Sequence, residues 1–197
     1  MAISGAASRS VEFLLLRKPK GKVDRSIARF ELEGLTREFA FADNICAAAC
    51  DRAGVALFEI IPDDSIGYCG NYEMGGSVRG LVFGDSLLYV ASGKGGIAIL
   101  DVRSPDSPRE IGRIERSGVS DVAISGNILV AALDEVGVLV FDIASPARPV
   151  ELASYGNSGL ATNVSIIGDH ILLADQYSLY ILRMENIETA EKERSGQ

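Results

Sequence analysis

Residues 96–118 read GIAILDVRSPDSPREIGRIERSG, and residues 137–159 read GVLVFDIASPARPVELASYGNSG. The two stretches align without a gap at a shift of 41 residues. They share a glycine, an aspartate and a proline at matching positions: Gly96 and Gly137, Asp101 and Asp142, and Pro105 and Pro146. Self-similarity at a period of about 40 residues indicates a repeat protein.

The repeat extends to both sides of this pair. Residues 39–60 align with residues 81–102 at a shift of 42, and residues 166–184 form a copy that lacks two residues of the glycine turn. A half copy opens the chain as SIARFELEG, residues 26–34. The repeat therefore divides the chain into N-terminal strands completing a blade (1–34), three blades (35–76, 77–118 and 119–159), an incomplete last blade (160–185) and a polar tail (186–197).

Each repeat contains four short segments typical of β-strands. In the second complete repeat we expect strands over residues 78–83, 87–92, 97–102 and 110–115. These segments are rich in Val, Ile, Leu and Tyr, and clusters of Gly, Asp, Ser and Pro separate them. Four antiparallel strands in about 40 residues are typical of a β-propeller blade. The sequence thus predicts an all-β chain, a β-propeller with about four four-stranded antiparallel blades.

The glycine-rich turn SGKGG, residues 92–96, raises the question of a phosphate site. A phosphate cradle presents several backbone amides at the start of a helix. Here a strand follows the turn, and the matching turns CDRAG (50–54) and LDEVG (133–137) keep only the last glycine. We therefore predict a hairpin turn in which Gly96 and Gly137 adopt positive φ.

The segments GIAILDVRSPDSPREIGRIE and GVLVFDIASPARPVELASY resemble the LVIVD repeat, a propeller blade named after its third strand. The resemblance covers roughly residues 35–184 and is strongest in the two middle repeats. It weakens where Glu59 and Arg183 replace the aspartate. LVIVD-like proteins are often bacterial or archaeal surface proteins, and their propellers generally serve as binding platforms without defined catalysis. The resemblance therefore implies a binding propeller.

The aspartates and prolines of the repeat are predicted to be structural. Asp101 and Asp142 end a strand shortly before a Ser-Pro pair. An aspartate at this place can accept hydrogen bonds from turn amides, and Pro105 and Pro146 preset φ for the turn.

Few residues suit nucleophilic or zinc chemistry. His170 is the only histidine, and we expect it in the turn before the second strand of the last repeat. The equivalent residues of the other repeats are Asn44, Ser86 and Asn127, so we interpret His170 as a surface residue. Cys46 and Cys50 lie four positions apart on one predicted strand, roughly 13 Å at about 3.3 Å per residue, too far for one metal ion. Cys46 and Cys69 are expected to be small buried side chains.

Three aspartates recur in the turn between the first and second strands: Asp43, Asp85 and Asp169. Gly126 takes the fourth place. Such a ring at one mouth of the propeller could bind calcium, because hard cations favour several carboxylates. The alternative is that these residues only suit tight hairpin turns.

The composition limits the partners. The chain of 197 residues has 27 acidic and 19 basic residues, a net charge of −8. Nucleic acid and anionic membranes attract proteins with surplus Lys and Arg, so we expect neither as a partner. Three cysteines and no apolar leader segment favour the cytoplasm, or the surface or periplasm where a leader has been removed.

We expect a non-catalytic binding or scaffold module that recognises a protein or polymer on a loop face. A metal-dependent hydrolase or lactonase at the central channel and a self-assembling structural subunit are the alternatives, because a fold does not determine a function.

The predicted strands also suggest how the ring closes. We expect two strands in residues 11–32 and three in residues 160–184, so the first repeat lacks inner strands and the last lacks its outer strand. The N-terminal strands could complete the last blade, within one chain as a four-bladed ring or between two chains as an eight-bladed homodimer.

Overall fold

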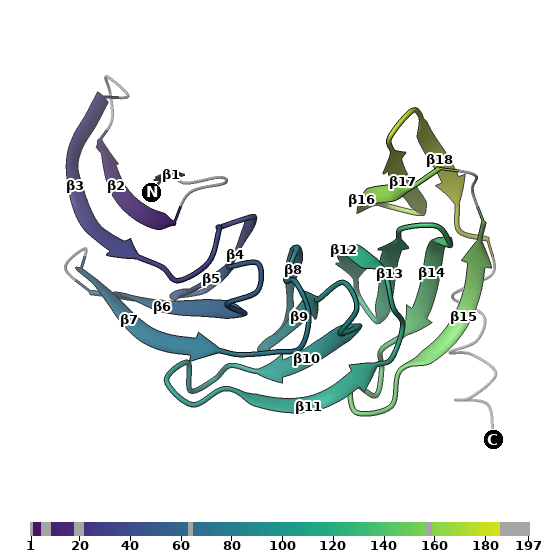
Figure 1. Cartoon of the computed structure of the whole chain (residues 1–197), viewed down its shortest axis with the longest axis horizontal. Coiled ribbons are helices and arrows are strands. Elements are labelled where there is room, and N and C mark those ends of the chain that lie inside the picture. The colour runs from purple at the N-terminus through teal and green to yellow at the C-terminus, as the bar shows by residue number, and fades with distance from the viewer. Residues whose placement is uncertain (1, 5–8, 18–21, 63–64, 157–158, 186–197) are drawn as a thin grey trace.

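The computed structural model describes residues 2–4, 9–17, 22–62, 65–156 and 159–185. These residues form five antiparallel sheets that follow one another along an open arc (Figure 1). The described part of the chain contains no helix, and hence none long and apolar enough to span a membrane. The all-β propeller architecture with four-stranded blades is confirmed, and the predicted polar tail over 186–197 lies outside the described residues.

The three middle sheets have four strands each, and we name them blade 1, blade 2 and blade 3. Blade 1 consists of β4 (Glu38–Ala42), β5 (Ile45–Ala49), β6 (Val55–Ile61) and β7 (Ser65–Tyr72). Blade 2 consists of β8 (Gly80–Gly84), β9 (Leu87–Ala91), β10 (Ile97–Asp101) and β11 (Arg109–Ile114). Blade 3 consists of β12 (Val119–Ser125), β13 (Ile128–Leu133), β14 (Gly137–Asp142) and β15 (Val150–Tyr155).

The two end sheets have three strands each. The N-terminal sheet contains β1 (Ala2–Ser4), β2 (Ser10–Arg17) and β3 (Lys22–Glu31). The C-terminal sheet contains β16 (Ala161–Ile167), β17 (His170–Asp175) and β18 (Leu179–Arg183). Within the described residues the C-terminal sheet has three strands, and residues 186–197, which follow it, lie outside that part of the chain, so the lack of an outer fourth strand stays a prediction.

A β-bulge recurs between the third and fourth strands and fixes how the repeats correspond. It lies between Leu57 and Phe58 in blade 1, between Ile99 and Leu100 in blade 2, and between Val140 and Phe141 in blade 3. In the N-terminal sheet β2 and β3 have a bulge between Phe13 and Leu14. The strands β2 and β3 therefore correspond to the third and fourth strands of a blade.

Apolar side chains fill the space between successive sheets. Separate buried clusters join the N-terminal sheet to blade 1, blade 1 to blade 2, blade 2 to blade 3, and blade 3 to the C-terminal sheet. Successive side chains of a strand point to opposite faces of its sheet, and here both faces carry apolar residues because each blade packs between two neighbours. Burial of both faces explains the high apolar content of the repeat.

A backbone hydrogen bond also links each blade to the next. The amide of Val78 donates to the carbonyl of Asp51 over 2.9 Å, and the amide of Ala161 donates to the carbonyl of Asp134 over 2.8 Å. The amide of Val119 donates to the carbonyl of Gly93 over 3.2 Å at the middle junction. The second turn of each blade thus holds the start of the following inner strand.

The N-terminal strands do not complete the last blade of the same chain, and their completing the last blade of a second chain stays a prediction. They form a sheet of their own with an additional strand, β1, whose three residues are too few for a sequence pattern. Phe13 and Phe30 of this sheet contact Phe58 of blade 1, with ring centroids 5.4 and 5.1 Å away. This aromatic cluster holds the sheet beside blade 1, at the opposite end of the arc from the C-terminal sheet (Figure 1).

Candidate functional site

The predicted aspartate ring requires a correction of one residue. Asp43, Asp85 and Gly126 occupy the first turn position with φ between 49° and 55°, but Gly168, with φ 60°, occupies it in the C-terminal sheet. Asp169 therefore corresponds to the second turn position, and His170 begins β17 instead of lying in the turn. The positive φ of the first position, which glycine and aspartate tolerate, decides this register.

The three aspartates are not brought together. Asp169 instead binds Arg183, whose Nε lies 3.0 Å away, and His170, whose Nδ1 lies 2.6 Å away. The hydrogen bond from Arg183 lowers the pKa of Asp169. Within the described ranges, no three His, Cys, Asp or Glu side chains gather closely enough to bind a metal ion.

The repeat aspartates lie at strand ends, as their spacing predicts. Asp142 accepts a hydrogen bond of 2.8 Å from the Ala144 amide, and Asp101 accepts one of 3.1 Å from the Arg103 amide. The Arg103 guanidinium, by hydrogen bonding, lowers the pKa of Asp101 to about 2.

Each Ser-Pro pair lies in a turn after the aspartate. The amide of Ser107 donates to the carbonyl of Ser104 over 2.9 Å, and that of Arg148 donates to Ser145 over 2.8 Å. Pro105 and Pro146 therefore occupy the second position of a four-residue turn, where a fixed φ is favourable.

The glycine turn is a hairpin between the second and third strands. Gly96 has φ 77° and Gly137 has φ 99°, and β9 pairs with β10 directly across the turn. A β-carbon at Gly96 would lie 2.3 Å from the Ile114 carbonyl oxygen. Both the backbone conformation and the close approach require glycine here.

The cysteines are free thiols. Cys46 and Cys50 are buried between the N-terminal sheet and blade 1, and Cys69 is half-buried. Burial raises the pKa of Cys46 to about 12, so its thiol stays protonated and unreactive at neutral pH.

Two carboxylates near the start of the inner strands link neighbouring sheets, and the sequence did not predict this role. Glu38 accepts a hydrogen bond of 2.7 Å from the Leu81 amide of the next blade. Asp121 accepts one of 2.8 Å from the Val164 amide of the C-terminal sheet. Burial, with the nearby Asp121 charge as a second cause, raises the pKa of Glu38 to about 7, and burial raises that of Asp121 to about 6. Both carboxylates therefore join neighbouring sheets.

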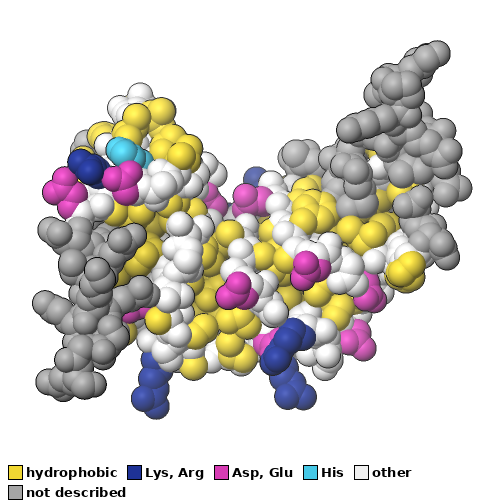
Figure 2. Space-filling model, turned by 180° about the vertical axis from the view of Figure 1, so that it is seen from behind, with side chains coloured by type: hydrophobic (Ala, Val, Ile, Leu, Met, Phe, Trp, Pro, Cys, Tyr) yellow, Lys and Arg dark blue, Asp and Glu magenta, His cyan; other side chains and the backbone are white. Residues whose placement is uncertain are grey.

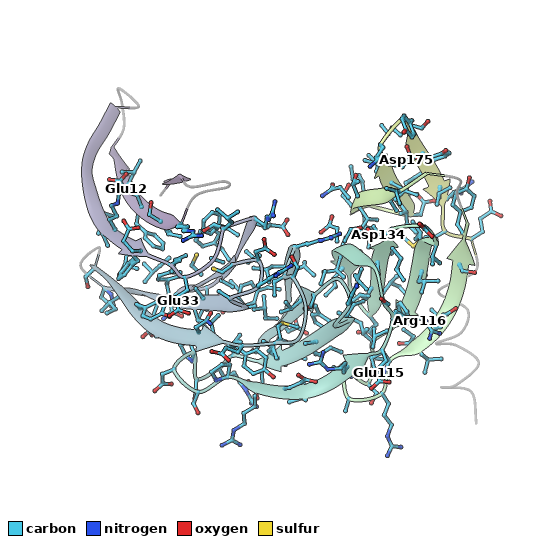
Figure 3. All side chains as sticks on the ribbon, viewed as in Figure 1. Glu12, Glu33, Glu115, Arg116, Asp134 and Asp175 are labelled. Carbon is cyan, nitrogen blue, oxygen red and sulfur yellow. The ribbon has the colours of Figure 1, made fainter. Side chains whose placement is uncertain are left out.

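A cleft of about 510 Å³ opens between the N-terminal sheet and blade 1, and it too was missed. Its lining comes from the end of β3, from the turn after β5, and from β7. Charged side chains lie on its rim and apolar ones within it: Arg29, Glu31, Glu33 and Glu73, and Phe30, Leu32, Cys50, Ala53 and Ala56. Figure 3 shows Glu33 where the chain passes from the N-terminal sheet to blade 1.

Aromatic rings form one side of this cleft. Tyr68 is 49% exposed, and its ring centroid lies 5.5 Å from Phe58 and 6.2 Å from Phe30. Burial first, then the Cys50 thiol and the Glu33 carboxylate, raise the pKa of Tyr68, so its ring is neutral. The cleft therefore combines a half-exposed neutral ring with carboxylates, an arrangement suited to a cationic group.

The family model for the LVIVD repeat matches residues 75–115 and 118–157. The chain contains two LVIVD repeats. They coincide with blade 2 and blade 3, and the structure extends the same four-stranded unit to blade 1. No curated protein matches the sequence.

Solved propeller structures share the architecture. The computationally designed Ika4 protein matches with a TM-score of 0.66 at 15% identity, over 78% of this chain and 93% of its own. The computationally designed Ika8 protein matches with a TM-score of 0.71 at 16% identity, over 92% of this chain and 55% of its own. The RRP9 WD40 repeats match with a TM-score of 0.67 at 14% identity, over 88% and 56%. This chain thus spans little more than half of the latter two, and the similarity concerns the fold alone.

Proposed function

We propose that this chain is a non-catalytic propeller module that binds a basic segment of a protein partner in the cleft between the N-terminal sheet and blade 1. The observation that carries the proposal is the cleft itself. Its volume of about 510 Å³ lies within the roughly 300–1,000 Å³ of ligand sites. A lysine or arginine side chain with its flanking residues fits this space.

The charges on the rim favour a cation. Three carboxylates face one arginine, and Arg29 is already paired with Glu31 over 3.3 Å. Among the described residues Glu33 and Glu73 have no ion-pair partner. The chain's net charge of −8 adds long-range attraction for a basic segment.

The apolar part of the cleft suits the stem of the same side chain. Lys and Arg bury their methylene groups against apolar surface and keep the charged end near water. Leu32, Ala53 and Ala56 offer such surface below the rim, and Tyr68 offers a ring face to the cation. A guanidinium gains more from ring stacking than an ammonium does, so arginine is the preferred residue.

Calorimetric titration with a short arginine-rich peptide tests the proposal. We expect binding that weakens with salt, since exposed charges are screened within about 8 Å at physiological ionic strength. Exchanging both free rim carboxylates, Glu33→Gln and Glu73→Gln, should weaken binding about tenfold or more. Tyr68→Ala should weaken it further, and a lysine peptide of equal length should bind less tightly.

The control removes the same charge elsewhere. Glu115 and Glu135 are exposed and lie outside the cleft, so Glu115→Gln with Glu135→Gln should leave binding nearly unchanged. Equal weakening by the control pair would mean that only net charge attracts the peptide. That result, or the absence of binding by the wild type, would refute the proposal.

A further inference from the structure

A second cleft, of about 390 Å³, opens between blade 2 and blade 3. One wall comes from β9 and from the turn that precedes it, and the other comes from the end of β12, the turn after it and the connection that follows β14. The amide of Ile143 donates to the carbonyl of Asn127 over 2.8 Å, so the connection is fixed against the turn. The volume lies within the roughly 300–1,000 Å³ of small-molecule sites.

Apolar side chains from both blades line the second cleft. Phe83 comes from blade 2, and Ile124, Ile143 and Pro146 come from blade 3. Figure 2 shows the side of the molecule on which the single histidine is visible, and hydrophobic side chains reach the surface there along the middle of the arc, with acidic side chains between them. The cleft can therefore bury an apolar group of modest size.

Tyr89 brings a hydroxyl group without a partner to the second cleft. The residue is 2% exposed, and its hydroxyl forms no hydrogen bond with the residues that the structure describes. A tyrosine hydroxyl that is buried normally has a hydrogen-bond partner. Burial first, and then the Asp85 charge, raise the pKa of Tyr89, so the hydroxyl keeps its proton. This polar group is therefore free to bind a molecule in the cleft.

The repeat itself does not require a tyrosine at this position. The strand pairing and the recurring bulge make Ala47 and Val130 the equivalents of Tyr89 in blades 1 and 3, and neither side chain has a polar atom. Gly84 is likewise a glycine in blade 2 alone, and a β-carbon there would lie 3.2 Å from Cε2 of Tyr89. Blade 2 thus combines a ring that the fold does not need with a glycine that makes room for it.

Asp85 supplies the charge of the second cleft. It is exposed in the turn between β8 and β9, and it is the only charged residue in the lining. In the part of the chain that the structure describes, Asp85 forms no ion pair. A carboxylate accepts hydrogen bonds, and so does a tyrosine hydroxyl oxygen. The cleft therefore offers two acceptors and one negative charge beside apolar side chains.

We propose that the second cleft binds a small primary amine with an apolar body. The ammonium group donates to the Asp85 carboxylate and to the Tyr89 hydroxyl oxygen, and the apolar body contacts Phe83 and Ile124. The single negative charge of the lining favours a cation over a neutral or anionic molecule of the same shape. The peptide cleft proposed above lies between the N-terminal sheet and blade 1, so the two proposals are independent.

Amide NMR spectra recorded during titration with 2-phenylethylamine test the proposal. The amide signals of Gly84 and Asn127 should shift to saturation, because both residues line the second cleft. The neutral 2-phenylethanol and the anionic 3-phenylpropionate keep the ring and its two-carbon linker, and each should bind about tenfold or more weakly than the amine.

Two conservative variants assign the binding to the second cleft. Asp85→Asn should weaken the affinity for 2-phenylethylamine about tenfold or more, and Tyr89→Phe should weaken it about fivefold. Asp43→Asn is the matched control, because Asp43 has φ 49° at the equivalent turn position, where Asp85 has φ 52°, and lies outside the cleft. Its affinity should stay within about twofold of the wild type.

The same titration separates this proposal from the peptide cleft. Glu33→Gln with Glu73→Gln removes two carboxylates of the peptide cleft and should leave the affinity for 2-phenylethylamine unchanged. The amide spectrum of each variant also shows that it is folded. The absence of saturable binding by the wild type, equal binding of 3-phenylpropionate, or an equal loss in Asp43→Asn would overturn the proposal.

Discussion

Asp121 of blade 3 occupies the space that Gly80 of blade 2 leaves open. A β-carbon on Gly80 would lie 2.6 Å from Asp121 Oδ1 and 3.0 Å from its Cα atom. The space lets the Asp121 carboxylate accept hydrogen bonds of 2.8 Å from the amides of both Val122 and Val164. Asp121 thereby holds its own inner strand and the first strand of the C-terminal sheet.

We predict that Gly80→Ala destabilises the protein. The new methyl group collides with the Asp121 backbone as well as its side chain, and overpacking of this kind costs typically about 1–3 kcal/mol. Urea denaturation measures the loss. Gly75→Ala is the control, because a β-carbon at Gly75 meets nothing within 4 Å. Equal stability of the two variants would show that Asp121 moves aside freely.

We predict that stability falls as pH rises from about 5 to 8, in part because of Glu38. Burial raises the pKa of Glu38 from 4.5 to about 7, so between these values the folded protein keeps a proton that the unfolded chain has lost. Folding then becomes less favourable as pH rises, because the unfolded state binds fewer protons.

The variant Glu38→Gln isolates this contribution. The glutamine carbonyl can still accept the Leu81 amide, but its side chain does not titrate. Thermal unfolding at pH 5, 6, 7 and 8 should show a flatter decline for Glu38→Gln than for the wild type. Glu115→Gln, an exposed control, should keep the wild-type slope, and equal slopes for all three proteins would contradict the prediction.

The repeat made most of the fold predictable. A period of 41–42 residues with four strand segments identified the blades, and the strands of blade 2 begin and end within two residues of their predicted bounds. Glycine turns and Asp-x-x-Ser-Pro turns depend only on residues close together in the chain, so the sequence predicts them. The strand β1 of the N-terminal sheet was not predicted because a strand of three residues has no periodicity.

The site was less predictable because it depends on contacts between repeats. Glu38 and Asp121 each accept a hydrogen bond from the first strand of the following sheet, a contact that exists only once the sheets have packed together. The cleft joins Glu33 to Tyr68, which belong to different sheets. Asp169 was misplaced by one residue because both members of its turn suit a hairpin, and only φ distinguishes them.

We predict that replacing two glycines of similar φ by aspartate changes the stability of the protein by different amounts. Gly126 has φ 55° and open space around it, and its equivalents Asp43 and Asp85 already adopt this conformation. Gly126→Asp should therefore change stability by less than about 0.5 kcal/mol, as for most surface substitutions. Gly96→Asp should cost about 2 kcal/mol or more, because strain adds to a collision with the Ile114 carbonyl.

Chemical denaturation of the two glycine variants checks this difference. Lys94→Ala in the same turn as Gly96 should be nearly silent, because Lys94 is exposed. A large loss from Gly126→Asp would show that the first turn position tolerates aspartate only in blades 1 and 2.

We predict that Asp142 stabilises the turn after the third strand of blade 3. Asp142 is 7% exposed and accepts the amide of the exposed residue Ala144 over 2.8 Å, so Asp142→Ala removes this hydrogen bond. Loss of a hydrogen bond of this kind costs about 0.5–1.5 kcal/mol. Asp106→Ala, an exposed aspartate in the matching turn of blade 2, should cost less than about 0.5 kcal/mol. Amide hydrogen exchange at Ala144 should accelerate in Asp142→Ala alone, and unchanged protection there would show that the carboxylate contributes little to the turn.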